Sequence, residues 1–68
     1  MNQAQAKIIL LYAKENMNLS EVARQAHYHR NTLEFHLGRI CDITGLDPKN
    51  FYDLVELVGM ANEILKEG

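Results

Sequence analysis

The sequence predicts an all-α domain, a four-helix, bundle-like fold without a sheet that contains a helix-turn-helix. Apolar residues recur at helical spacing in four segments, and short breaks separate these segments. No alternating β-branched run and no Asn-Gly or Asp-Gly hairpin turn is present. A chain of 68 residues corresponds to one domain. We therefore assign residues 1–68 to a single domain and place the helix-turn-helix over about residues 18–44.

The first helix is expected over about residues 3–16, and its apolar residues cover most of its circumference. Ile8 and Leu11 share one face, whereas Ile9 and Leu10 point in other directions. A helix that is apolar on most sides is usually buried against more than one neighbour. We therefore expect the first helix to lie deep in the domain.

The second helix is expected to follow Asn18. Glu21 stands three residues after this asparagine, which is the spacing of a capping box with asparagine as the N-cap. Leu19 and Val22 begin the apolar stripe of this helix, and two alanines continue it. Only a short break separates this helix from the next one.

The third helix is expected from about Arg30 to Thr44, where apolar residues recur on one face. Gly45 follows as a suitable residue for the left-handed C-terminal cap. The buried face is predicted to hold Leu33, Leu37, Ile40 and Thr44, with Cys41 beside them. The opposite face is predicted to hold Asn31, Phe35, Gly38, Arg39 and Asp42, with Glu34 on its flank.

The fourth helix is expected over about residues 48–66, with Asp47 as its N-cap and Pro48 as its first residue. Its apolar residues are Phe51, Leu54, Val55, Leu57, Val58, Met60, Ala61, Ile64 and Leu65. They cover well over half of the helix, which is more than one buried face requires. A single core with a few exposed apolar residues is one explanation. We favour a homodimer through the first and fourth helices.

Charge is distributed unevenly along the chain, whose net charge is −2 with neutral histidines. Residues 24–41 carry a net charge of +2 and all three histidines, whereas residues 42–68 carry −4. The acidic total is unusual for a nucleic-acid binder. However, the positive charge lies on the helix-turn-helix and the negative charge behind it, which is the polarity that docking on DNA requires.

Several classes of protein are disfavoured by simple features. Cys41 is the only cysteine, so no disulfide forms within the chain, and a lone thiol is typical of the cytoplasm. The start of the chain lacks the pattern of a secretion signal. The longest apolar stretch, residues 8–13, is too short to span a membrane. We therefore expect a cytoplasmic protein without membrane contact.

The three histidines and the thiol are the residues that could suggest metal binding or catalysis. A structural zinc site needs paired ligands at short spacings, usually with several cysteines. Cys41 instead falls on an apolar helix face, and His27 and His29 fall in a turn. Cys41 and His36 could act as nucleophile and base, but no substrate cavity is foreseeable in so short a chain. We expect no metal, no cofactor, no small-molecule substrate and no enzymatic activity.

The third helix begins with the polar residues His29, Arg30, Asn31 and Thr32, directly after the short break. Two helices held so closely, with hydrogen-bonding residues at the start of the second, are typical of a helix-turn-helix that reads DNA. The residue string itself thus predicts double-stranded DNA as the partner.

Three strings carry a resemblance to a known family: Asn-Leu-Ser-Glu-Val-Ala-Arg at 18–24, His-Arg-Asn-Thr-Leu at 29–33 and Ile-Thr-Gly-Leu-Asp at 43–47. Over about residues 8–62 the chain resembles the C-terminal helix-turn-helix of PucR-type regulators, which control purine and sugar-diacid catabolism. It resembles the nucleoid protein Fis more distantly. The resemblance implies a DNA-binding transcription regulator of bacterial or phage type.

One short segment departs from the family pattern. The family commonly has Arg-Tyr-Arg after Thr-Leu, whereas this chain has Glu34, Phe35 and His36. The aromatic ring is kept, and the two arginines are replaced by an acid and an imidazole. Together with the acidic balance, this supports an alternative function, a protein–protein interaction module that kept the fold and no longer binds DNA.

If the third helix enters the major groove, its residues suit different contacts. Asn31 matches adenine and Arg30 matches guanine through paired hydrogen bonds. Glu34 can accept a hydrogen bond from cytosine, and Phe35 can contact a thymine methyl group. The side chains expected to contact DNA are His29, Arg30, Asn31, Thr32, Glu34, Phe35 and Arg39. Among them Thr32 and Arg39 are expected to contact phosphates, and His29 occupies the N-cap position.

Overall fold

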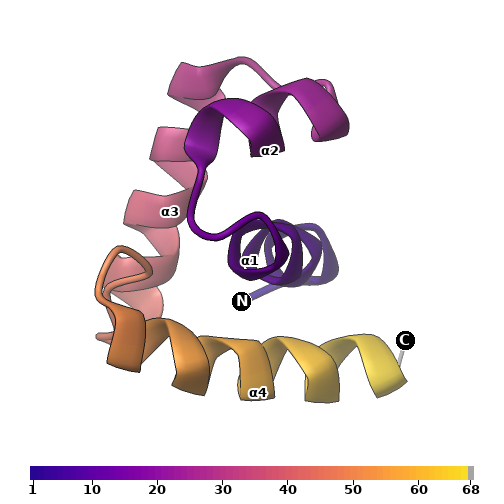
Figure 1. Ribbon diagram of the computed structural model, residues 1–68. Helices are drawn as coiled ribbons and strands as arrows, with labels where there is room; N and C mark the ends of the chain where they lie inside the picture. Colours follow the sequence, from indigo (N-terminus) through magenta and orange to yellow (C-terminus); the bar gives the residue numbers. More distant parts are fainter. Residues whose placement is uncertain (68) are drawn as a thin grey trace.

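The computed structural model describes residues 1–67 and contains four helices (Figure 1). These are α1 (Gln3–Lys14), α2 (Leu19–Ala26), α3 (Arg30–Thr44) and α4 (Phe51–Glu67). The described residues contain no strand, which confirms the all-α prediction.

The central helix is α1, which contacts each of the other three helices. In Figure 1 it is seen nearly end-on, with α2 above it, α3 beside it and α4 below it. Ala6 and Ile9 are fully buried and Ile8 nearly so, which confirms the prediction that this helix is covered on more than one side. The rest of the buried apolar core is Tyr12, Leu19, Val22, Leu33, Leu37, Ile40, Leu54, Leu57 and Ala61.

A complete capping box, which was not among the predicted features, stands at the start of α1. Asn2 Oδ1 accepts a hydrogen bond from the backbone N–H of Gln5 at 2.8 Å, and Gln5 Oε1 accepts one from the backbone N–H of Asn2 at 3.0 Å. Two N–H groups that a helix start leaves without partners are therefore satisfied. This cap fixes the position at which the central helix begins.

The N-cap of α2 is Asn18, as predicted, because its Oδ1 accepts a hydrogen bond from the backbone N–H of Glu21 at 3.1 Å. The predicted capping box is wrong in its second half. The backbone N–H of Asn18 donates to the carbonyl oxygen of Glu15, and the Glu21 carboxylate accepts hydrogen bonds from Arg24 and Gln25. The Arg24 hydrogen bond lowers the pKa of Glu21 to about 2.

Replacing the α2 cap should destabilise the domain. Asn18→Ala is expected to lower the free energy of unfolding by about 1 kcal/mol, because an N–H group at the start of α2 loses its acceptor. Urea denaturation followed by circular dichroism measures this. Asn31→Ala is the matched control, since Asn31 is exposed and lies just inside a helix without capping it. Equal losses in the two variants would contradict the capping role.

The break between α2 and α3 is a turn closed by backbone hydrogen bonds. His27 adopts a left-handed conformation with φ 58°, and its N–H and that of Tyr28 both donate to the carbonyl oxygen of Ala23. His29 returns to an extended conformation and becomes the N-cap of α3. At the other end of α3, Gly45 has φ 74°, which confirms the predicted left-handed cap.

The start of α4 differs from the prediction. Asp47 does not cap the helix, because its backbone carbonyl accepts a hydrogen bond from the N–H of Asn50 and closes a turn. Asn50 is the N-cap, since its Oδ1 accepts a hydrogen bond from the N–H of Asp53 at 3.1 Å. Phe51 is therefore the first helical residue, three positions later than predicted.

Candidate nucleic-acid interface

The outer face of α3 is exposed along its whole length, while its inner face forms part of the core. Leu33, Leu37 and Ile40 are buried, as the spacing predicted. Residues on the outer face and its flank that are exposed are Asn31, Thr32, Phe35, Gly38, Arg39 and Asp42. Phe35 is 64% exposed, although an aromatic side chain of this size is usually covered.

The N-terminal end of α3 is the one helix start among α1, α2 and α3 that lacks a side-chain cap. His29 is exposed and occupies the N-cap position, but its side chain accepts no hydrogen bond from the helix. The backbone N–H groups of Arg30, Asn31 and Thr32 therefore have no acceptor within the helix. Such a helix end attracts anions through its N–H groups and its dipole.

Arg30 connects the two helices of the motif. Its Nη1 donates a hydrogen bond to Ser20 Oγ in the first turn of α2, at 3.3 Å. Among the residues that the structure describes, neither Arg30 nor Arg39 takes part in an ion pair with a carboxylate. The two guanidinium groups therefore remain available for an external anion.

Glu34 lies on the flank of the outer face and forms an ion pair with a residue that is distant in the sequence. Its Oε2 is 2.8 Å from the Nζ of Lys49, which belongs to the turn before α4. This hydrogen bond raises the pKa of Lys49. Both side chains are about half exposed, so the pair contributes little to stability. The pair does neutralise the single carboxylate near the start of the outer face.

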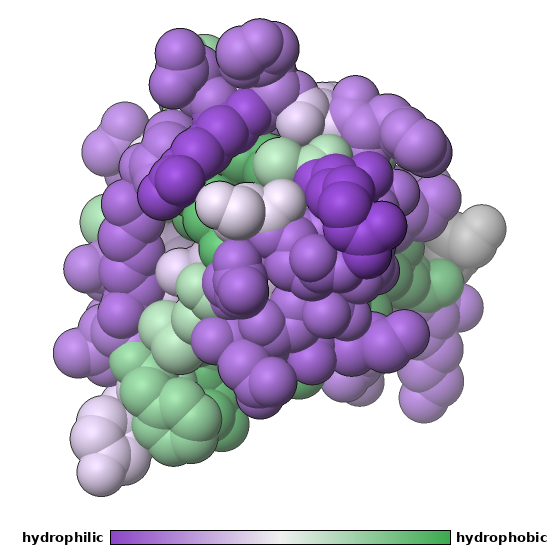
Figure 2. Space-filling view, turned by 45° about the horizontal axis from the view of Figure 1, so that its top comes forward, coloured by the Kyte–Doolittle hydropathy of each residue, from purple (hydrophilic) through white to green (hydrophobic). Residues whose placement is uncertain are grey.

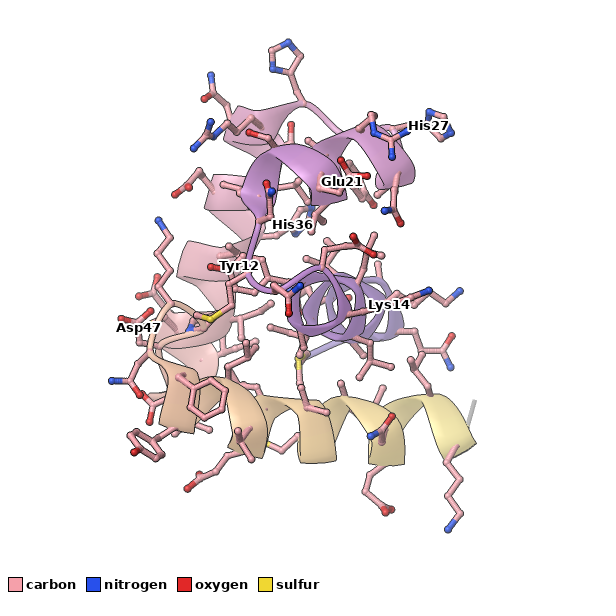
Figure 3. All side chains as sticks on the ribbon, viewed as in Figure 1. Tyr12, Lys14, Glu21, His27, His36 and Asp47 are labelled. Carbon is pink, nitrogen blue, oxygen red and sulfur yellow. The ribbon has the colours of Figure 1, made fainter. Side chains whose placement is uncertain are left out.

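His36 does not belong to the outer face. Figure 3 shows it on the inner side of α3, whereas His27 projects away from the molecule. The His36 ring lies 5.9 Å from the rings of both Tyr28 and Phe35, and its buried Nδ1 has no hydrogen-bond partner. His36 occupies one of the two positions where the family commonly has arginine. This position therefore packs against the α2–α3 turn.

Cys41 is half-buried and lines a shallow hollow with Gly38 and Pro48, on the side of α3 that faces the turn before α4. Within residues 1–67 no three side chains of the metal-binding types gather at one place. None of the described helices combines the length and the apolar character needed to cross a bilayer.

The two helices, their short turn and the exposed polar start of the second helix define a helix-turn-helix domain. The family model of the PucR C-terminal helix-turn-helix domain matches residues 6–59. The chain therefore belongs to this family, which indicates a DNA-binding transcription regulator. No curated protein and no solved structure matches the chain.

The structure brings five of the seven predicted contact residues into one continuous region. His29, Arg30, Asn31 and Thr32 form the first turn of α3, and Phe35 follows one turn later. Arg39 lies about one further turn along the exposed side, and Glu34 is turned toward Lys49. Lys49 and Ser20 were missed because each lies ten or more positions from its partner in the sequence.

Proposed function

We propose that this domain regulates transcription by reading double-stranded DNA with α3 in the major groove. The observation that carries the proposal is the first turn of α3, which combines exposed polar side chains with uncapped backbone N–H groups. Recognition helices present this end to base edges. Membership of the PucR family supports the same function.

The contacts divide into two kinds. Arg30 and Asn31 would pair with the edges of guanine and adenine, and Phe35 would contact a thymine methyl group. Thr32, Arg39 and the free N–H groups after His29 would hold phosphates, which orient the domain without reading sequence. Glu34 could accept a hydrogen bond from cytosine only if its ion pair with Lys49 were broken. We therefore propose a different role for this ion pair. It reduces the repulsion between Glu34 and the DNA backbone.

The charge distribution supports this orientation on DNA. From the last turn of α2 through most of α3, residues 24–41 sum to +2, and the following residues, 42–68, sum to −4. In Figure 1 the N-terminal end of α3 lies beside α2, at the opposite end of the molecule from α4. A domain that approaches DNA with α3 would therefore keep its acidic helix away from the phosphates.

We further propose that the domain acts as a homodimer in the cytoplasm, through a surface on α4 and the adjoining end of α1. Large apolar side chains on α4 remain exposed, among them Phe51, Tyr52 and Val55. Figure 2 shows an apolar patch at the lower left of the molecule, on the side where α4 begins. A two-fold dimer would present two α3 helices to successive major grooves, about 34 Å apart, on an inverted repeat.

Selection of bound sequences from random duplexes tests the function. The intact protein is expected to enrich one inverted-repeat sequence, and its affinity should fall steeply between 50 and 200 mM salt because phosphate contacts release counterions. Failure to bind any duplex at low salt would overturn DNA reading.

An interaction module without DNA binding is the second candidate, and the 64% exposure of Phe35 favours it. A protein that ignores DNA at low salt and retains one stoichiometric protein partner would establish that function. The partner should then be lost on Phe35→Ala. If the protein reads DNA, Phe35→Ala should instead weaken its binding to the selected duplex and leave its binding to other proteins unchanged.

A further inference from the structure

One stripe of α4 borders the face that packs on the core and has the spacing of a coiled-coil seam. Its members recur at alternating intervals of four and three residues: Phe51, Val55, Val58, Asn62 and Leu65. We call this stripe the seam. Phe51 is 62% and Val55 56% exposed, Asn62 is exposed, and Val58 and Leu65 are half-buried. The fully buried residues of α4, Leu54, Leu57 and Ala61, lie on the neighbouring face. Val58 and Leu65 of the seam also pack against the core.

We propose that the seam pairs with the seam of a second copy of this chain, with the two α4 helices parallel and in register. Alternating intervals of four and three keep apolar residues on the contact line of a two-stranded coiled coil. Val55 and Asn62 then occupy the a positions, and Phe51, Val58 and Leu65 the d positions. This inference deepens the homodimer of the proposed function and rests on it.

Asn62 decides the direction of pairing. In a parallel, in-register pair each Asn62 faces its own copy, and a carboxamide can both donate to and accept from another carboxamide. In an antiparallel pair centred on Val58, Asn62 would face the region of Val55 and bury its carboxamide without a partner. A single polar residue at an a position sets register in this way.

The occupant is a second copy because the seam complements itself. None of its five residues carries a charge, so a strongly acidic or basic partner would find no counterpart. Gly59, beside the seam, supports close approach of another helix. A Cβ added at Gly59 would meet nothing within 4 Å in the protomer, so its own fold gives no reason for a glycine. Glycine inside a helix is otherwise unfavourable.

The position of the seam is compatible with DNA reading. In Figure 1 α4 lies at the C-terminal end of α3, whereas α2 and the first turn of α3 lie at the other end. Pairing through the seam therefore leaves the first turns of both α3 helices uncovered. One helix pair buries less surface than the roughly 1,200–2,000 Å² of standard stable interfaces. We expect a dimer that dissociates on dilution. Binding to a duplex with two half-sites should stabilise this dimer.

Sedimentation equilibrium of the intact protein tests the pairing. Val55→Glu should raise the dimer dissociation constant by more than about tenfold, because a carboxylate cannot be buried on an apolar contact line without a large cost. Met60→Glu is the matched control, since Met60 is 39% exposed on another side of the same helix. The control should stay within about threefold of the original protein, and circular dichroism verifies that both variants fold.

Disulfide trapping tests the direction. In a Cys41→Ser background, Leu65→Cys should form a covalent dimer under mild oxidation, because parallel helices bring the two copies of position 65 together. Glu63→Cys, at the same end of α4 but off the seam, should not. Trapping of both cysteines alike, or of neither in a dimeric protein, would overturn the parallel arrangement.

The outcomes separate this inference from the proposed function. A protein that stays monomeric at high concentration and on DNA, yet binds duplexes, overturns the seam and leaves DNA reading intact. A protein that dimerises through the seam and ignores DNA at low salt overturns DNA reading and leaves the seam intact.

Discussion

Arg30→Ala is expected to weaken binding to the selected duplex by about 5- to 150-fold and to relax specificity at one base pair. The loss corresponds to the roughly 1–3 kcal/mol that one bidentate arginine–guanine contact contributes. The guanidinium is exposed at the first residue of α3 and pairs with no described carboxylate. Fluorescence titrations with the selected duplex and with single-base variants measure both effects.

Two controls interpret this result. Ser20→Ala removes only the internal hydrogen-bond partner of Arg30 and should leave affinity nearly unchanged. Arg39→Ala should weaken binding to all duplexes alike. It should also lower the slope of log affinity against log salt concentration by about one, because one fewer counterion is released. If Arg30→Ala also weakened all duplexes equally, Arg30 would have to be reassigned from a base to a phosphate.

Ile9→Ala is expected to cost about 2–5 kcal/mol, the usual range for a large side chain removed from a core. Ile9 is fully buried in α1, the helix that contacts all the others. A domain of this size has a total stability of roughly 3–10 kcal/mol, and short chains bury the smallest share of their surface. Ile9→Ala should therefore be partly unfolded at 37 °C.

Ile43→Ala is the matched control, because it makes the same substitution at a side chain that is 49% exposed on α3. Its cost should stay within about 0.5 kcal/mol, as is usual on surfaces. Urea unfolding at low protein concentration, where dimers are dissociated, compares the two variants. Similar midpoints for both would contradict the central position of α1.

The parts of the fold that the sequence predicted are those set by local signals. The bounds of α3 were predicted as Arg30 and Thr44, because the apolar spacing marks the helix and Gly45 marks its end. The cap of α2 at Asn18 was also predicted, since this contact spans only three residues. Fold class follows from the same short-range patterns.

The predictions that were wrong concern features that depend on competition between nearby partners or on contacts between distant residues. Asp47 and Asn50 are both good N-caps, and only the backbone turn between them decides that α4 starts after Asn50. The Glu21 carboxylate had several possible partners and took Arg24 and Gln25.

The candidate site was predicted in part for the same reason. Helical spacing placed Asn31, Phe35 and Arg39 on the exposed side of α3, where the structure has them. The partners of Arg30 and Glu34 could not be predicted, because Ser20 and Lys49 approach them only through the packing of other elements. The role of each side chain toward DNA stays a prediction.

A titration of the ¹⁵N-labelled protein with the selected duplex at low salt tests the central claim most directly. The backbone amide signals of the first two turns of α3, from Arg30 to Phe35, should shift most. The amide signals of exposed α4 residues near Asn62 should shift only when the protein dimerises. Equal shifts of both helices on a half-site duplex, or no shift anywhere, would contradict the reading of DNA by α3.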